Sequence, residues 1–218
     1  KQRNVLQAAG LITAKEKLTA EEVWTRFEAI QPVVIDLASG EELTEVDVAT
    51  FDQRAEAKEP TTSSEAPENL ARVTRLPERA LVYKLLDENG SLDLIVLPIE
   101  GKGLWSTLYG FLALDADLQT VRGITFYEHG ETPGLGGEVD NPNWKAKWVG
   151  RKVFGAEGGV ELEVIKGRAG PPEEDPYAVD GLSGATLTAR GVSHLVRFWL
   201  GENGFANYLE ALEKRRSA

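Results

Sequence analysis

Cysteine and methionine are both absent from this chain of 218 residues, and histidine occurs only at His129 and His194. Without cysteine the chain forms no disulfide, holds no cysteine-ligated iron–sulfur cluster and has no thiol nucleophile. The two histidines lie far apart and outside any HExxH arrangement, so a zinc site is not expected. Any redox chemistry of this chain therefore requires a separate cofactor.

Positive charge is also scarce, with 24 Lys and Arg against 35 Asp and Glu and a formal net charge of -11. The sequence contains no basic stripe, so nucleic acid is not an expected partner. No apolar run approaches the roughly 20 residues that cross a bilayer. Because position 1 is Lys rather than Met, we interpret the chain as a processed or truncated form.

The apolar pattern predicts an α+β fold, in which a mostly antiparallel, twisted sheet is flanked by N- and C-terminal helices. At 42% hydrophobic residues, the chain can bury one good core or two small ones. Residues 39–77 form a polar span, with a mobile surface loop expected over 59–68. The predicted helices are 20–30, 188–200 and 205–212, with a short amphipathic segment at 144–148; the predicted strands are 32–37, 80–86, 92–99, 105–113, 121–127, 151–154 and 160–165.

The segment 180–188, DGLSGATLT, places three hydroxyl side chains among small residues just before a predicted helix. One interpretation is a helix N-terminus, since a Ser or Thr hydroxyl caps free backbone N–H groups and Asp180 suits the positive end of the helix dipole.

Two further segments are rich in glycine. The first, 131–138, reads ETPGLGGE and allows a close backbone approach to a flat or anionic ligand, although it also suits a plain turn after the strand 121–127. It has neither the P-loop nor the dinucleotide-binding spacing. The second, 101–105, reads GKGLW. Its Lys102 suits a solvated hairpin, and its Trp105 is more typical of a core residue than of a ligand platform.

Taken in order, GKGLWSTLYG, HGETPGLGGE and DGLSGATLT resemble the FMN-binding domain of the C subunit of the Na+-translocating NADH:quinone oxidoreductase (Nqr). The resemblance covers residues 80–200, and the N-terminal third follows more loosely. The related G subunit of the Rnf complex shares the ETPGLG and SGAT elements, whereas GKGLW and NPNW look more like the Nqr protein.

The resemblance implies a covalent FMN, attached through its phosphate to Thr186 as a phosphoester, with Thr188 as the alternative acceptor. Ser183 and Thr188 are then candidates for helix caps or for hydrogen bonds to the phosphate. The other residues that it places at the flavin are Asp180, Gly184, Ala185, Glu131, Thr132, Gly134, Leu135, Gly136 and Gly137, together with Lys102 and Trp105.

The resemblance also implies a location and partners. Residues 1–18 are expected to follow an N-terminal membrane helix, and 19–218 to form a periplasmic FMN-binding domain, with a helix/strand part at 19–79 and the flavin-binding part at 80–218. A flavin transferase would attach the cofactor. The domain would relay electrons between flavin and iron–sulfur neighbours in the bacterial inner membrane, on a route from NADH to quinone that drives sodium export.

Two alternatives remain open from the residues alone. A noncovalent FMN-binding reductase domain would release its flavin on denaturation. A non-redox interaction module, in which DGLSGATLT is only a helix cap, would stay colourless.

Overall fold

A computed structural model describes residues 1–216 and contains a five-stranded antiparallel sheet. The strand order is β1-β4-β5-β6-β7. The predicted hairpin and the two strands after it are confirmed, as is the α+β class. The strands are β1 (Ile30–Asp36), β4 (Arg79–Leu86), β5 (Leu92–Lys102), β6 (Thr107–Asp115) and β7 (Val121–Glu128).

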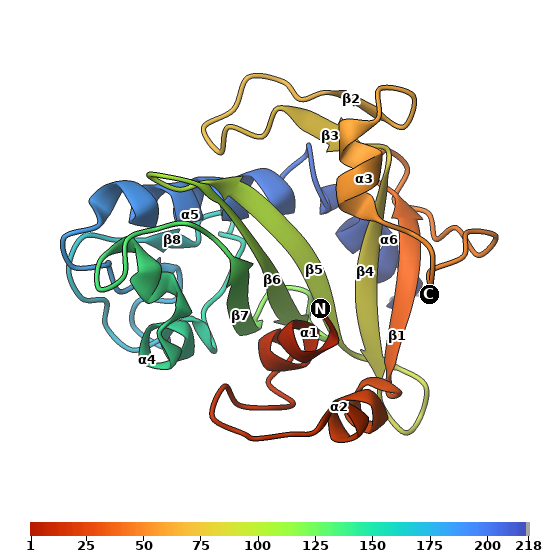
Figure 1. Cartoon of the computed structure of the whole chain (residues 1–218), viewed down its shortest axis with the longest axis horizontal. Coiled ribbons are helices and arrows are strands. Elements are labelled where there is room, and N and C mark those ends of the chain that lie inside the picture. Colours follow the sequence, from red (N-terminus) through yellow and green to blue (C-terminus); the bar gives the residue numbers. More distant parts are fainter. Residues whose placement is uncertain (217–218) are drawn as a thin grey trace.

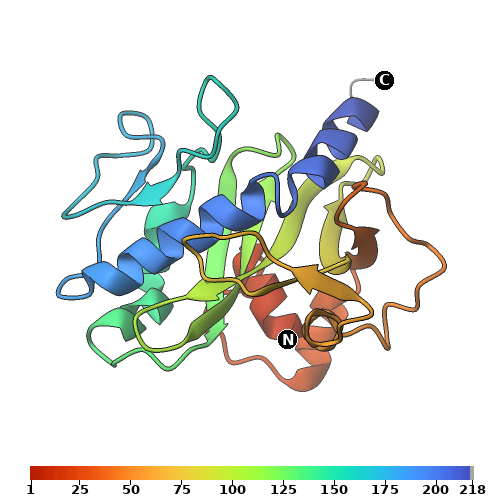
Figure 2. The same cartoon turned by 90° about the horizontal axis from the view of Figure 1, so that it is seen from above.

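Helices lie on both faces of this sheet (Figures 1 and 2). The long helix α5 crosses one face over β5, and α1 packs against β6 and β7 on the other. Within residues 1–216, no helix is long and apolar enough to cross a membrane. The α-helices are α1 (Gln2–Ala8), α2 (Ala20–Phe27), α3 (Gln53–Lys58), α4 (Pro142–Lys145), α5 (Thr186–Leu200) and α6 (Ala206–Arg216), with 3-10 turns η1 (Gly136–Asp140) and η2 (Ala146–Trp148).

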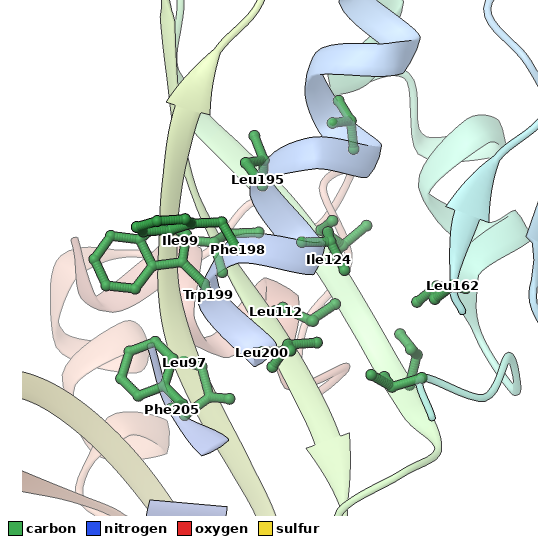
Figure 3. Packing of buried hydrophobic residues seen from close by; sticks show 14 of the residues in the cluster. Leu97, Ile99, Leu112, Ile124, Leu162, Leu195, Phe198, Trp199, Leu200 and Phe205 are labelled. Atoms are coloured by element: carbon green, nitrogen blue, oxygen red, sulfur yellow. The ribbon is translucent and has the colours of Figure 1, made fainter. Parts of the chain in front are cut away.

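The central strand β5 is apolar on both faces because each face is covered by a helix. Ile95 and Leu97 join the core beneath α5, whereas the alternate residues Leu94 and Val96 join a second core beneath α1. Figure 3 shows the first core, in which Leu195 and Trp199 of α5 lie over the sheet. The chain thus buries two cores, one on each side of a single sheet.

The N-terminal segment forms a helix that the sequence pattern did not indicate. In α1, Val5, Leu6 and Ala8 have no solvent exposure, so burial against the sheet supplies the stability that seven residues lack in isolation. The span 39–77 also contains α3 and a small hairpin, β2 (Ser63–Glu65) with β3 (Arg75–Pro77).

The strands predicted at 151–154 and 160–165 were largely wrong. This region has isolated bridges and one two-stranded parallel ladder, β8 (Glu163–Val164) with β9 (Ala178–Val179). The buried guanidinium of Arg151 donates to the carbonyl oxygens of Lys147, Gly170 and Asp175. The backbone of residues 151–154 pairs with separate segments, since the N–H of Lys152 donates to the carbonyl oxygen of Pro176 and that of Val153 to the carbonyl oxygen of Gln119, so no continuous ladder forms.

Helix α5 offers a matched pair of leucines for testing this packing. We expect Leu195→Ala, at a fully buried site, to lower the free energy of unfolding by about 2–5 kcal/mol. Leu187→Ala, at a site 55% exposed on the same helix, should change it by no more than about 0.5 kcal/mol. Urea denaturation measures both, and equal losses would contradict the core described for α5.

Candidate functional site

The carboxylate of Glu131 joins the three segments that the sequence singles out. Glu131 lies in the glycine-rich loop after β7 and is only 5% exposed. Its Oε1 accepts N–H bonds from Trp105 at 2.9 Å and Ser106 at 3.0 Å, both in the loop between β5 and β6. Its Oε2 accepts the hydroxyl of Thr188 in α5 at 2.6 Å and the N–H of Leu104 at 3.2 Å. The predicted proximity of the three segments is therefore present in the fold.

The hydrogen bonds determine the charge state of this carboxyl group. Desolvation by burial acts to raise the pKa of Glu131, but the hydroxyl of Thr188 and the N–H groups of Trp105, Ser106 and Leu104 outweigh it. The pKa of Glu131 therefore lies below its ordinary value, and the group is an anion at neutral pH. Because its oxygens are occupied by these donors, Glu131 holds the loops together rather than presenting a free carboxylate.

Two glycines make room for this carboxylate. A Cβ on Gly136 would lie 2.5 Å from the hydroxyl oxygen of Thr188 and 2.8 Å from Oε2 of Glu131. A Cβ on Gly103 would lie 2.7 Å from Oε1 of Glu131. Gly136 and Gly103 thus allow the close approach of their loops to the Glu131 carboxylate.

His129 completes this cluster and was missed as a site residue by the sequence analysis. Its Nδ1 accepts the backbone N–H of Glu131 at 3.2 Å, so the ring proton of the neutral form resides on Nε2. Nε2 lies 2.9 Å from a carboxylate oxygen of Asp140. The one available indication was its place two residues before Glu131 in HGETPGLGGE.

The hydroxyl residues of DGLSGATLT have different environments. Thr186 is exposed at the first position of α5, whereas Thr188 is 1% exposed and donates to Glu131. No side chain caps this end of α5, so the prediction that Ser183 or Thr188 is a helix cap was wrong. Ser183 is exposed in the loop that precedes the helix. The first-turn N–H groups of α5 consequently remain available to solvent or to a ligand.

Asp180 has a structural role different from the one expected near the helix dipole. Its Oδ1 accepts the N–H of Ala169 at 3.1 Å, and its carbonyl oxygen accepts the indole N–H of Trp144 at 2.8 Å. The NPNW segment that ends at Trp144 therefore holds the start of the DGLSGATLT loop in place.

Exposed apolar side chains lie on each of the three segments that meet at Glu131. Trp105 is 66% exposed, so the expectation that it belongs to the core was wrong, and Lys102 donates to its carbonyl oxygen at 3.1 Å. Leu135 is 43% exposed and lies against Gly184, and Leu187, which the sequence analysis did not select, is 55% exposed.

The remaining predicted residues form the turns that carry these side chains. The carbonyl oxygen of Thr132 accepts the N–H groups of Leu135 and Gly137. Gly134 and Gly184 adopt positive φ angles of 76° and 69°, which favour glycine. Ala185 is buried at the N-cap position of α5.

A sheet flanked by helices, with glycine loops facing an uncapped helix N-terminus, defines a domain suited to a phosphate-bearing planar cofactor. In agreement, residues 103–201 match the FMN-binding domain family. The chain is 46% identical over 218 residues to the C subunit of the Na(+)-translocating NADH-quinone reductase from Yersinia pestis, spanning 98% of this chain and 80% of that protein. It is also 46% identical to the corresponding protein from Pseudomonas aeruginosa, spanning 98% of this chain and 82% of that protein.

Solved structures agree. The crystal structure of NqrC from Shewanella oneidensis superposes with a TM-score of 0.88 at 36% identity, covering 98% of this chain and 96% of that one. The C subunit from Parabacteroides distasonis, at 24% identity and a TM-score of 0.71, shares the fold over 95% of this chain and 90% of that one. The chain belongs to the NqrC family, the C subunits of the Na+-translocating NADH-quinone reductase, an oxidoreductase complex, and the predicted family is confirmed.

Replacing the central carboxylate tests its role. We expect Glu131→Gln to lower the free energy of unfolding at neutral pH by about 2–3 kcal/mol, because the amide nitrogen would face an N–H donor and the charge would be lost. Glu157→Gln, at an exposed position, is the matched control and should change stability by no more than about 0.5 kcal/mol. The measurement is urea denaturation of both variants.

The effect of Glu131→Gln should also depend on pH. Because the folded-state pKa of Glu131 lies below 4.5, its ionised form stabilises the fold fully above about pH 4.5, and this contribution is lost as the pH falls through the folded-state pKa. The stability difference between wild type and Glu131→Gln should therefore shrink in acid. A difference that grows on acidification would contradict the assignment.

The close approach at Gly136 yields a separate prediction. We expect Gly136→Ala to lower the free energy of unfolding by about 1–3 kcal/mol, because its methyl group would separate Thr188 from Glu131. Gly159→Ala is the control, since a Cβ there meets nothing within 4 Å. Thermal denaturation compares the two, and equal stability of both variants would remove the steric argument.

Proposed function

We propose that this chain carries an FMN, esterified through its phosphate to the hydroxyl of Thr186, and relays electrons as the C subunit of an Na+-translocating NADH-quinone reductase. The observation that supports this attachment site is the contrast between the two threonines of the motif. Thr186 is exposed and has no partner among the described residues, whereas Thr188 is buried and donates to Glu131. A transferring enzyme can reach the first hydroxyl and not the second.

The residues around Thr186 fit a phosphate. Thr186 begins a helix of 15 residues whose N-terminus has no side-chain cap and no acidic residue in its first turn. The free N–H groups and the positive end of the helix dipole favour the negative charge that a phosphodiester retains. Gly184, in a left-handed conformation, leads into this turn without a Cβ.

The same surface fits a planar ring. Trp105, Leu135 and Leu187 present apolar surface to solvent beside the attachment point. Exposed apolar groups gathered in one place are typical of a ligand or partner site. Lys102 donates to the carbonyl oxygen of Trp105, and this bond stabilises the loop that carries the indole ring.

The bound FMN would supply reversible acceptance and release of electrons, and the chain would position it. A covalent tether keeps the cofactor at an effective concentration on the order of millimolar or higher, so a shallow surface site suffices. An open site leaves the ring accessible to a partner, which suits a relay better than a substrate-converting enzyme. An isolated domain is expected to show no turnover of NADH or quinone.

Location and partners are further parts of this proposal, based on family membership. We place the domain on the periplasmic side of the bacterial inner membrane, attached by a single helix, with residues 1–18 leading into the FMN-binding domain at 19–218; within residues 1–18, α1 is part of the folded unit because it packs on β6 and β7. Its partners would be the flavin and iron–sulfur subunits of the complex and a flavin transferase.

The attachment is tested by the mass of the denatured protein after production with a flavin transferase. We expect wild type to gain one FMN minus one water, Thr186→Val to gain nothing, and Thr188→Val to keep the full gain despite lower stability. Thr188→Val retains the acceptor and loses only the bond to Glu131. Fragmentation of the peptide that contains both residues assigns the modified one.

Other results would support the alternatives. A gain that maps to Thr188 would move the attachment site. A yellow protein that releases its colour on unfolding would be a noncovalent flavoprotein, and a protein that stays colourless would be an interaction module.

A further inference from the structure

The surface around Thr186 gathers positive charge on a chain whose net charge is -11. Four cations from separate parts of the sequence lie on elements that adjoin the DGLSGATLT motif. Because they are distant in sequence, they form no basic stripe that the sequence alone would show. We call this set the basic rim: Lys147 in η2, Lys166 and Arg168 in the loop before β9, and Arg190 in α5.

Hydrogen bonds fix the loop of Lys166 and Arg168 against the DGLSGATLT motif. The N–H of Gly181 donates to the carbonyl oxygen of Gly167 at 2.7 Å, and a Cβ on Gly181 would collide with the carbonyl oxygen of Ile165. Lys166 and Arg168 flank Gly167 and are both exposed. Neither forms an ion pair within residues 1–216, so both charges remain directed to solvent.

The other two cations bound the same surface. The ammonium nitrogen of Lys147 lies 3.9 Å from Oδ2 of Asp180, at the start of the motif, and its side chain is 53% exposed. Arg190 is exposed one helical turn after Thr186, so it shares that face of α5.

Nearby carboxylates offset part of this rim, because Asp180 pairs with Lys147, and Asp175 and Glu174 lie against Gly170, two residues after Arg168. Glu131 is buried in its own hydrogen bonds. Asp140 pairs with the ring of His129, and the side chain of Asp180 is 18% exposed and accepts the N–H of Ala169. Lys166, Arg168 and Arg190 are exposed and form no ion pair within residues 1–216, so three cations of the rim remain available to a partner of opposite charge.

An apolar centre inside a charged rim is the usual anatomy of a protein interface. Trp105, Leu135 and Leu187 supply exposed apolar side chains on the three segments that meet at Glu131, one of which carries Thr186. We propose that the basic rim is the docking surface for the protein that exchanges electrons with this chain, and that this partner presents an acidic patch around its own redox centre. The inference rests on the proposed function, since it makes the FMN at Thr186 the centre of the contact.

A protein partner is favoured over a lipid surface by the charge of the whole chain. An anionic membrane acts on the whole molecule within a Debye length and repels a net charge of -11. A protein patch of matching size acts on the rim alone, where opposite charges raise the rate of productive encounters.

A charge reversal with a matched control tests the inference. The test variant is Lys166→Glu with Arg168→Glu, and the control is Lys15→Glu with Lys17→Glu. The control reverses the charge of two exposed lysines, so the total change in charge is the same. Both lysines precede α2, in a segment on the other side of the sheet from α5 (Figure 1). The rate of FMN reduction by NADH is measured by stopped flow in membranes that contain the assembled reductase with each variant chain, at low and high ionic strength.

We expect the FMN on the test variant to be reduced about tenfold more slowly than the FMN on the control at low ionic strength. The difference between the two rates should narrow as salt screens the charges. Equal rates for the two variants at low ionic strength would overturn the inference. Loss of covalent FMN from the test variant alone would also overturn it, by assigning the rim to the flavin transferase. Binding of wild type, but not of the test variant, to phosphatidylglycerol vesicles would assign the rim to the membrane.

The mass spectrum of the denatured wild-type chain distinguishes failure of this inference from failure of the proposed function. Wild type without attached FMN would overturn both proposals. Wild type with FMN on Thr186, together with equal rates for the two variants, would leave the function standing and remove only the docking surface.

Discussion

The buried carboxylate of Glu131 is the contact on which the arrangement of the site depends. It accepts hydrogen bonds from the loop between β5 and β6 and from the first turn of α5, while it is itself part of the loop after β7. A buried anion is stable only when its lone pairs are satisfied, so the three segments must meet in this one geometry. His129 holds the backbone of Glu131, and the glycines at 103 and 136 permit the approach.

The sheet supplies the frame for this contact. Helix α5 packs its buried face, including Leu195 and Trp199, on the core over β5, and it carries Thr186 at its exposed N-terminus. One helix therefore belongs to both the core and the site. Because its position is fixed along 15 residues, the proposed attachment point is held on a rigid element although the segments around it are loops.

Thr186 and Thr188 are chemically alike but differ in burial. Thr186 and Thr188 are two positions apart, so they point in different directions around the helix, one to solvent and one to Glu131. The same geometry gives the hydroxyl of Thr188 a structural contact and leaves the hydroxyl of Thr186 free for the proposed attachment. The fold also carries Lys147, Lys166, Arg168 and Arg190 on elements that adjoin the DGLSGATLT motif, although they lie far apart in the sequence.

The sequence by itself determined the antiparallel hairpin and strands at the centre of the chain, the C-terminal helices, the family, and the three segments that form the site, because periodicity and glycine motifs are local properties. It missed α1, whose stability comes from burial against β6 and β7, and it predicted strands near Arg151, where the backbone makes isolated pairings with separate segments instead of a ladder. It did not reveal the exposure of Trp105 or the partner of Thr188. Only the tertiary structure decided these features, because each depends on contacts between residues far apart in the chain, such as Glu131 with Thr188, which no local pattern records.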